Sequence, residues 1–300
     1  MFQEFRSSGL GGVENYKKKV YLPFGMTVAQ RCRSGAPELL QLLDSFRMDP
    51  TQRFSDRVEN YAKFRPNYPD ALIRFLLEQL PLPGTIADIG SGTGILSAQL
   101  LRAGYAVFGV EPNAPMRQEA ERSLSGRPGF QSIVGTAEDT MLAPGSVEAV
   151  TCAQSFHWFD RQRCRSEFGR ILRSPRLVFL IWNERTNQDP TEEYDRILQE
   201  SAPEYCCVSQ RHVTHADIAA FFAPDPVDLL HFPHGQRLDR ESFLGRVLSS
   251  SYVPNVGQPG HDTLMQRMEA LFEKHAQSGW IEFPYQTRVY LARLTSRTFS

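Results

Sequence analysis

Between residues 70 and 182, short apolar runs alternate with segments whose apolar positions recur at helical spacing. The apolar runs have the length of strands and are bounded by proline or glycine turns. The pattern predicts strands at Thr85–Ile89, Tyr105–Val110, Gln131–Val134, Val147–Ala153 and Leu177–Ile181. It predicts helices from an N-cap at Asp70 to Leu80, from Ile95 to a C-cap at Gly104, over Met116–Leu124, and from an N-cap at Asp160 to Leu172. This alternation is typical of right-handed βαβ units in a doubly wound, mostly parallel, Rossmann-like α/β sheet.

The alternation stops after Trp182, where a polar loop is predicted over Asn183–Pro190. In the strand predicted over Gln286–Leu291, alternate residues share one face, as in a half-exposed antiparallel strand. Another strand is predicted over Val227–Phe232, which gives a sheet of seven strands. Helices are predicted at Thr191–Ser201, Ala216–Phe222, Arg240–Ser249 and Thr263–His275. We expect these helical insertions in the C-terminal third to form a cover over the substrate.

Composition excludes several classes of protein. The 300 residues are 41% hydrophobic and 22% charged, which suffices for a sizeable core. The net charge of -1 gives no general attraction to nucleic acid or to an anionic membrane. Five cysteines without metal-like spacing argue against a disulfide framework, and no apolar run has the length of a membrane span. We therefore expect a cytoplasmic protein whose partner is a small molecule; the sequence leaves the oligomeric state open.

The first 47 residues differ from the rest of the chain. They hold three of the five lysines, at positions 17–19, whereas arginines number 28. We expect Met1–Arg47 to be a dispensable extension, with Met48 as a candidate initiator, and residues 48–300 to form a single domain. The alternative is a docked helix over Ala36–Phe46.

A glycine-rich turn follows the first predicted strand. Its sequence, D-I-G-S-G-T-G from Asp88 to Gly94, opens the helix that begins at Ile95, and Glu111 follows the next strand. Glycines let a ligand approach the backbone closely, the helix N-terminus offers free N–H groups, and an acid at this distance can bind two ribose hydroxyls. A dinucleotide fingerprint would need glycine where Ile95 stands. The alternative is a tight turn that binds no ligand.

The run D-x-G-x-G-x-G resembles motif I of the class I S-adenosylmethionine (SAM) methyltransferases. Residues 54–182 are similar to the small-molecule type of this family, the methyltransferase type 11 domain, which includes trans-aconitate methyltransferase-like enzymes. The resemblance implies that residues 54–182 are a SAM-binding core and that residues 183–300 supply the cover and the last two strands. It also implies that Asp88, Gly90, Gly92 and Gly94 line the amino-acid end of SAM, while Glu111 holds the ribose hydroxyls.

Two further segments resemble family features. The turn after the third strand contains Ala137 and Glu138, which the resemblance assigns to the adenine side of SAM. Thr136 stands where many relatives carry aspartate; a solvated acidic turn is the alternative. Upstream, Y-x-x-x-R-P-x-Y-P resembles the segment that covers the cofactor, so Arg65 is expected to pair with the SAM carboxylate and Tyr61 to close the site. A proline-stiffened surface loop would have a similar sequence.

The segment after the fourth strand, Gln154 to Asp160, should face the ligand crevice. Gln154 is expected near the sulfonium, His157 is a candidate general base, and Trp158 is a candidate substrate contact. The alternative is a packed aromatic step. No N/D-P-P-Y tetrapeptide stands here, which disfavours exocyclic base amines and glutamine as acceptors.

Six other histidines lie after Trp182, two pairs of them three residues apart: His212 with His215, and His231 with His234. Such pairs would face one side of a helix, but no acid or cysteine pattern accompanies them. We expect solvated histidines and no metal.

The sequence thus predicts a SAM-dependent methyltransferase acting on a small molecule by in-line displacement. A nucleotide-dependent oxidoreductase and a non-catalytic SAM- or nucleotide-binding scaffold are the alternatives.

Overall fold

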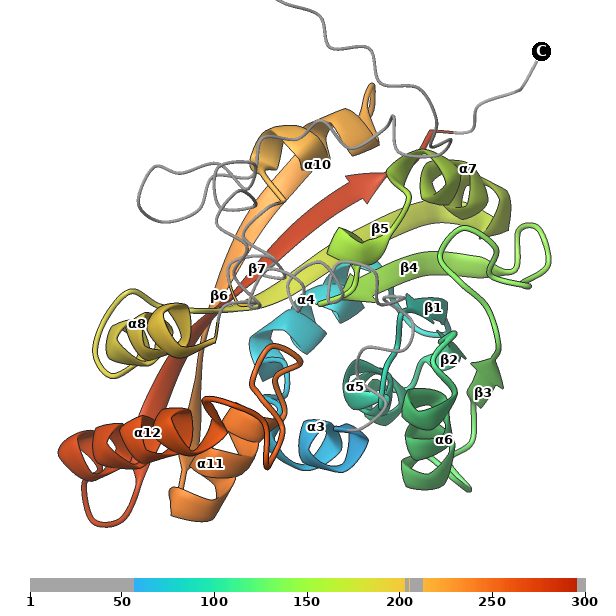
Figure 1. Cartoon of the computed structure of the whole chain (residues 1–300). Helices are drawn as coiled ribbons and strands as arrows, with labels where there is room; N and C mark the ends of the chain where they lie inside the picture. The colour runs from blue at the N-terminus through green and yellow to red at the C-terminus, as the bar shows by residue number, and fades with distance from the viewer. Residues whose placement is uncertain (1–56, 203–204, 206–212, 296–300) are drawn as a thin grey trace, which may run out of the picture. The chain divides into compact units, whose positions relative to one another are not determined.

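The computed structural model describes residues 57–202, 205 and 213–295, so the expected extension Met1–Arg47 lies outside the described residues. Its central feature is a seven-stranded sheet with the order β3-β2-β1-β4-β5-β7-β6 (Figure 1). The first five strands are parallel, whereas β7 runs antiparallel to both β5 and β6. Their bounds are β1 Thr85–Ile89, β2 Ala106–Val110, β3 Phe130–Ile133, β4 Val147–Ala153, β5 Leu172–Arg185, β6 Val227–Leu238 and β7 Ile281–Arg293. The predicted seven-stranded, mostly parallel Rossmann-like sheet is confirmed.

The helices follow the predicted alternation closely. Asp160 accepts hydrogen bonds from the amides of Gln162 and Arg163 and caps α7 as expected, and Gly104 ends α5 in the left-handed conformation. Asp70 is not an N-cap, because Pro69 holds that position and Asp70 is the first helical residue. The helices are α3 Val58–Phe64, α4 Asp70–Gln79, α5 Ile95–Ala103, α6 Ala114–Ser123, α7 Arg161–Ile171, α8 Thr191–Ser201, α10 His215–Phe222, α11 Arg240–Leu248 and α12 His261–His275, with a short 3-10 helix η3 at Phe156–Trp158.

Both faces of the sheet are covered, because neighbouring residues of its central strands enter opposite cores. Ile86 and Phe179 pack with α4 and α5, whereas Ala87 and Leu180 pack with α7 and α10. Parallel strands buried on both faces read as nearly continuous apolar runs, which explains why Leu177–Ile181 was recognisable from sequence.

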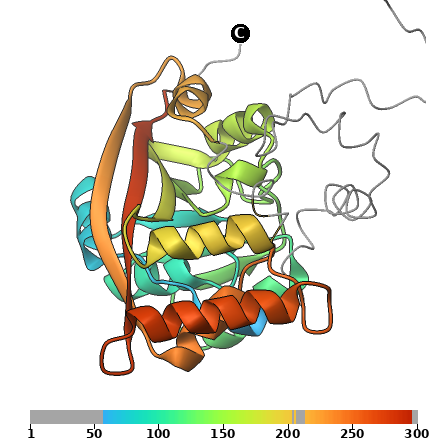
Figure 2. The same cartoon turned by 60° about the vertical axis from the view of Figure 1, so that its left-hand side comes forward.

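A third core joins α8, α11 and α12 to the ends of β6 and β7. Tyr194, Phe243 and Phe283 meet there edge to face, with ring centroids 5.2–6.1 Å apart. In Figure 2, α8 and α12 lie side by side. These three helices lie where the sequence predicted them, whereas the fourth predicted insertion, α10, packs with α7 in another core. Their role as a cover over the substrate stays a prediction, and Arg246 of α11 and Tyr285 of β7 line the pocket described below.

The last strands differ from the prediction in length and exposure. Asn183–Arg185 is not loop but the end of β5, because these residues pair with Tyr285–Thr287 of β7. β7 is not half-exposed beyond residue 288: Val289 and Leu291 are buried in one core while Tyr290 and Ala292 are buried in the other. In the described part of the chain, no helix is both long and apolar enough to span a membrane.

Helix α3 packs against α11, with a close contact between Phe64 and Gly245. A Cβ built on Gly245 of α11 would lie 2.1 Å from the ring of Phe64, so only glycine leaves room for this ring. The contact brings α3, with Tyr61 and the following Arg65, against α11.

Candidate active site

The glycine-rich turn contains three glycines with positive φ, but these glycines serve different purposes. A Cβ on Gly90 would lie 2.6 Å from Cβ of Ser155, and one on Gly94 would lie 2.9 Å from Leu124 of the segment after α6. A Cβ on Gly92 would meet only Met116, at 3.9 Å. Gly90 and Gly94 are therefore required by packing within the protein, whereas packing does not require Gly92. Its contact with a ligand stays a prediction.

Glu111 directly follows β2 and lies beside this turn, because the carboxyl ends of the parallel strands β1 and β2 meet at the same edge of the sheet. Its Oε2 accepts from the amide of Gly92 at 2.8 Å, and its Oε1 accepts from the amide of Asn113 at 2.9 Å. Burial raises the pKa of Glu111, and these two amides oppose the rise. The carboxylate is thus fixed beside Gly92. Its contact with ribose hydroxyls stays a prediction.

Asp88 lies beneath the turn rather than on its surface. Its side chain accepts hydrogen bonds from Ser97 Oγ at 2.7 Å and Thr151 Oγ1 at 2.9 Å, and only 1% of the residue is exposed. Burial raises its pKa to about 6, although both hydroxyls favour the ionised form. Asp88 thereby connects β1, α5 and β4 and fixes the turn above it.

The adenine-side candidates lie in the loop between β3 and β4. Ala137 is buried, and Oε1 of the half-buried Glu138 accepts from the amide of Asp160 at 2.8 Å. Glu138 therefore joins this loop to the start of α7. A purely solvated acidic turn does not describe it.

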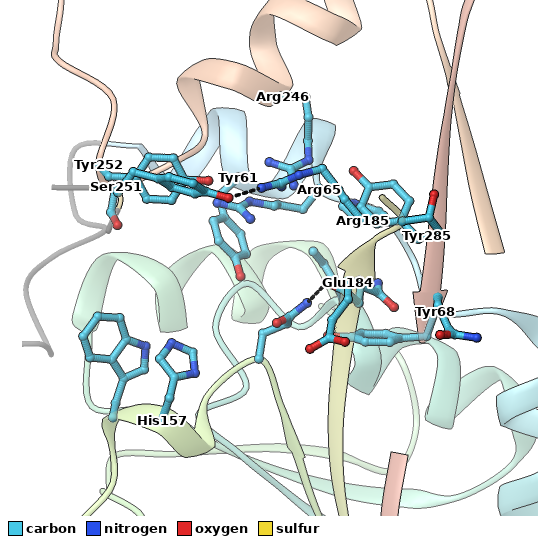
Figure 3. A pocket seen from close by; sticks show the side chains of 18 of the residues that line it. Tyr61, Arg65, Tyr68, His157, Glu184, Arg185, Arg246, Ser251, Tyr252 and Tyr285 are labelled. Carbon is cyan, nitrogen blue, oxygen red and sulfur yellow. Dashed lines mark hydrogen bonds between the residues drawn. The ribbon is translucent and has the colours of Figure 1, made fainter. Parts of the chain in front are cut away.

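A pocket of about 600 Å³ opens at the carboxyl ends of β4 and β5. Five residues singled out from the sequence line it: Tyr61, Arg65, Gln154, His157 and Trp158. Ile95, the first residue of α5, also lines it, so the pocket adjoins the glycine-rich turn. Figure 3 shows His157 on the opposite side of the pocket from Arg65 and Tyr61. The structure therefore brings together the predicted candidates from α3 and from the segment after β4.

Gln154 follows β4 in a conformation that non-glycine residues rarely adopt, with φ of 60°. Its backbone N–H donates to Ile181 O at 2.9 Å, and its side-chain Nε2 donates to Asn183 O at 3.1 Å. Both partners belong to β5. Non-glycine residues held this way are found preferentially at functional sites.

His157 and Trp158 belong to η3, and their ring centroids are 4.7 Å apart. Both the packed aromatic step and the exposure to a ligand crevice that the sequence suggested are therefore present. The role of His157 as a base stays a prediction.

Sequence reasoning missed the part of the pocket that comes from the C-terminal half of the chain. Arg185 comes from the end of β5, Arg246 from α11, Tyr252 from the following loop and Tyr285 from β7. No spacing motif links these positions. Their only sequence signal is the excess of arginine over lysine.

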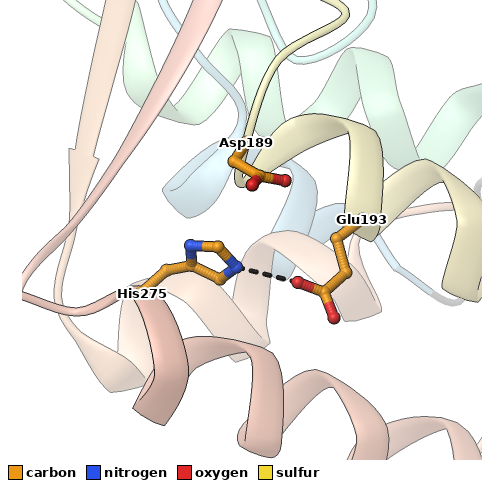
Figure 4. Close-up of side chains that lie close together, drawn as sticks. All are labelled: Asp189, Glu193 and His275. Atoms are coloured by element: carbon orange, nitrogen blue, oxygen red, sulfur yellow. Dashed lines mark hydrogen bonds and ion pairs between the residues drawn. The ribbon is translucent and has the colours of Figure 1, made fainter.

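One cluster outside the pocket has metal-ligand chemistry. Asp189, Glu193 and His275 offer ligand atoms within 4.8 Å of one another (Figure 4). Glu193 Oε2 accepts from both Lys274 Nζ and His275 Nε2 at 2.8 Å, and these bonds lower the pKa of Glu193. The carboxylate is already balanced by basic groups, and the cluster is an ion-pair network between α8 and α12.

The histidine predictions need correction. His275 is not simply solvated, because its side chain is 17% exposed and paired with Glu193. His261 is buried, and its Nδ1 lies 2.8 Å from Pro254 O. His231 and His234 lie on the strand β6, where residues three apart point to opposite faces, so they cannot form a helical metal pair. His212 lies outside the described residues. The expectation that no metal is bound stays a prediction.

Comparison with known proteins identifies the central region. Residues 87–179 match the family model described as a methyltransferase domain. An uncharacterized methyltransferase of Mycobacterium tuberculosis is 35% identical over 139 residues, which are 46% of this chain and 55% of that protein. One from Schizosaccharomyces pombe is 27% identical over 150 residues, which are 49% of this chain and 59% of that protein. The match spans between half and two thirds of the length of these relatives.

Solved structures share the fold over more of the chain. A proposed type II methyltransferase from Anaeromyxobacter dehalogenans aligns with a TM-score of 0.55 at 24% identity, covering 78% of this chain and 98% of that one. A proposed methyltransferase of an antibiotic biosynthesis pathway in Anabaena variabilis aligns with a TM-score of 0.55 at 20% identity, covering 76% and 98%. Residues 87–179 are thus similar to a methyltransferase domain, and the solved structures share the fold of the chain.

Proposed function

We propose that this chain, which is built around a methyltransferase domain, transfers a methyl group from SAM to a small-molecule acceptor by in-line displacement. One observation carries the proposal: the turn in which Glu111 is bonded to Gly92 leads directly into Ile95, which lines a pocket of about 600 Å³. A donor site that opens into a cavity with room for a second molecule is what a two-substrate transfer needs. The cavity has the size of a site for a small molecule.

The proposed donor site uses the turn and the strand ends around it. Gly92 lets the ligand approach the backbone, and Glu111 accepts from ribose hydroxyls with the lone pairs that remain after its two amide contacts. Gly90, Gly94 and Asp88 keep the turn in shape. Ala137 and Glu138 border the adenine side.

The other proposed contacts lie in the pocket. Arg65 binds the carboxylate of the donor with its guanidinium, whose carbon lies 4.7 Å from the centre of the Tyr61 ring. Gln154 lies on the acceptor side of the donor. Trp158 and Tyr61 offer aromatic faces to a cationic group.

When bound, SAM supplies an electrophilic methyl group on a sulfonium. The protein therefore has to align two substrates, a proximity effect of roughly 7 kcal/mol or more in favourable cases. A base is needed only where the acceptor must lose a proton. His157 is the candidate for that role, and a carboxylate acceptor would not require it.

Two observations weigh against the alternatives. Ile95 stands where a dinucleotide-binding turn has glycine, which disfavours an oxidoreductase. A scaffold without catalysis has no need of the part of the pocket that extends beyond the proposed donor contacts to Arg246 and Tyr285.

Calorimetry with SAM, S-adenosylhomocysteine and NADH tests the proposal. We expect S-adenosylhomocysteine and SAM to bind, and NADH to bind far more weakly. Tighter binding of NADH would favour the oxidoreductase. A screen of small acceptors with labelled SAM then tests turnover, and persistent failure to transfer label would favour the scaffold.

The domain boundaries are part of the proposal. We expect residues 48–300 to form the enzyme and residues 1–47 to be dispensable. Deletion of residues 1–47 should leave the melting temperature nearly unchanged; a large drop would contradict this division.

A further inference from the structure

Three arginines lie along one wall of the pocket (Figure 3). Arg65 follows α3, Arg185 ends β5 and Arg246 belongs to α11, and we call them the arginine cluster. Arg246 is only 3% exposed. A guanidinium stays charged at any physiological pH, so the cluster brings positive charge into the protein interior.

The acids near the pocket balance only one of the three arginines, Arg185. Asp195 Oδ1 accepts from Nε and Nη2 of Arg185 at 2.8 and 2.6 Å, and Glu184 pairs with Arg288 at 2.7 Å. In residues 57–202, 205 and 213–295, neither Arg65 nor Arg246 forms a salt bridge with a carboxylate. Arg65 and Arg246 are therefore the uncompensated cations of the wall.

Backbone carbonyls compensate only in part. Arg65 Nη2 donates to Ser249 O at 3.1 Å, at the end of α11, where a helix carries about half a negative charge. The buried Nε atoms of Arg65 and Arg246 have no acceptor within the described chain. The two guanidinium groups therefore offer more donors, and more charge, than the surrounding protein matches.

Neighbouring groups respond to this charge. Burial alone would raise the pKa of Tyr252, but Arg185, Arg65 and Arg246 together lower it. Burial and the adjacent Arg246 lower the pKa of Arg65. Tyr285, which is 3% exposed, carries a hydroxyl without a partner in the described part of the chain. The wall is therefore electropositive and holds a spare hydrogen-bond donor.

Unpaired buried charges are costly, and planar guanidinium groups match the oxygens of carboxylates and phosphates. We propose that the methyl acceptor is a small oxyanion, a carboxylic acid or a phosphate ester, whose anionic group binds Arg246 with Tyr285 and Arg185 beside it. This inference rests on the proposed function, because it names the acceptor of that same site.

The carboxylate of the methyl donor cannot balance the cluster alone. It would pair with Arg65, but SAM also carries an ammonium and a sulfonium and so brings a net positive charge. Arg246 would still lack a counter-ion, and the pocket would be more positive than before. An anionic acceptor supplies the missing charge.

Calorimetry on the full chain saturated with S-adenosylhomocysteine tests the inference. Citrate and inorganic phosphate are titrated separately at constant ionic strength, with glycerol as the uncharged control. We expect saturable binding of one or both anions and none of glycerol. The citrate titration reports a carboxylate site and the phosphate titration a phosphate site.

Two variants assign the binding to the cluster. Arg246→Met should weaken anion binding at least roughly 10-fold, as expected for the loss of a charged hydrogen-bond donor. Arg237→Met, at a side chain 59% exposed on β6, should leave it unchanged. Because Arg246→Met could disturb the fold, Tyr285→Phe is the second variant; it removes only the hydroxyl and should weaken binding several-fold without lowering the melting temperature.

The outcomes separate this inference from the proposed function. If S-adenosylhomocysteine binds but neither anion binds saturably in the millimolar range, the oxyanion inference is overturned and the methyltransferase proposal stands. Equal anion affinity in wild type, Arg246→Met and Tyr285→Phe also overturns it. If S-adenosylhomocysteine does not bind, the proposed function fails, whereas anion binding lost in Arg246→Met would still support the oxyanion site.

Discussion

The amide of Gly92 donates a 2.8 Å hydrogen bond to Oε2 of Glu111, which joins the turn after β1 to the end of β2. A second bond from the amide of Asn113 fixes the other oxygen of the carboxylate at 2.9 Å. The acid is therefore oriented before any ligand binds. Orientation of this kind reduces the cost of ordering groups on binding.

Replacement of Glu111 should weaken the donor site. In Glu111→Ala, the charged acceptor for ribose hydroxyls is lost, and we expect S-adenosylhomocysteine to bind more weakly by about 1.5–3 kcal/mol. Glu111→Gln keeps the shape of the side chain and should lose less. Calorimetry measures both. An unchanged affinity in Glu111→Ala would show that Glu111 does not contact the ligand.

Alanine substitutions at two glycines of the turn should affect ligand binding and fold stability differently. In Gly92→Ala, the new Cβ meets no protein atom closer than 3.9 Å, so the fold should lose only the roughly 1–2 kcal/mol of a left-handed alanine. Binding of S-adenosylhomocysteine should fall sharply, because the methyl group occupies the ligand space. In Gly94→Ala, the contact of 2.9 Å with Leu124 adds steric strain. Urea denaturation should therefore show Gly94→Ala to be the less stable variant.

Asp88 should make the stability of the fold depend on pH. Its pKa rises from 3.8 to about 6 on burial, so the folded state takes up a proton more readily than the unfolded state. The stabilisation is fully present below pH 4 and is lost as pH rises through about 6, with a total of about 3 kcal/mol.

The Asp88→Asn variant isolates this contribution, because the amide does not titrate. Relative to that variant, wild type should lose about 3 kcal/mol of unfolding free energy between pH 4 and pH 7. Urea denaturation at a series of pH values provides the measurement. Parallel pH profiles for the two proteins would contradict the raised pKa of Asp88.

Gly245 should be essential for the contact between α3 and α11. A Cβ 2.1 Å from the Phe64 ring forces the two helices apart, and such overpacking typically costs about 1–3 kcal/mol. Gly245→Ala should lower the melting temperature. Gly169→Ala is the matched control, because a Cβ there meets nothing within 4 Å and a helical alanine is favoured by roughly 0.5–1 kcal/mol.

The helix contact also has a functional consequence. Displaced α3 would carry Tyr61 and Arg65 away from the pocket. The affinities for the anion and for S-adenosylhomocysteine should therefore both fall in Gly245→Ala. The double variant Gly245→Ala, Phe64→Ala removes the ring and should restore part of both affinities. A double variant no better than Gly245→Ala would exclude this steric explanation.

The sequence predicted the elements that local patterns specify. Strands β1, β2 and β4 are short apolar runs between turn residues, and α7 begins at a visible cap, Asp160. It failed where pairing between distant segments extends a strand: Asn183 looked like loop, but β7 supplies its partners and covers it. Local polarity cannot reveal such a pairing.

The sequence by itself determined the residues of the proposed donor side. Asp88, Gly92 and Glu111 lie within one β–α–β unit, where chain direction and turn geometry bring them to the same edge. Only the tertiary structure decided the proposed acceptor side, where Arg246 and Tyr285 come from α11 and β7 and meet Arg65, which follows α3. Their charge and hydrogen-bonding state depend on burial and on neighbours far away in the chain, and no local spacing encodes these.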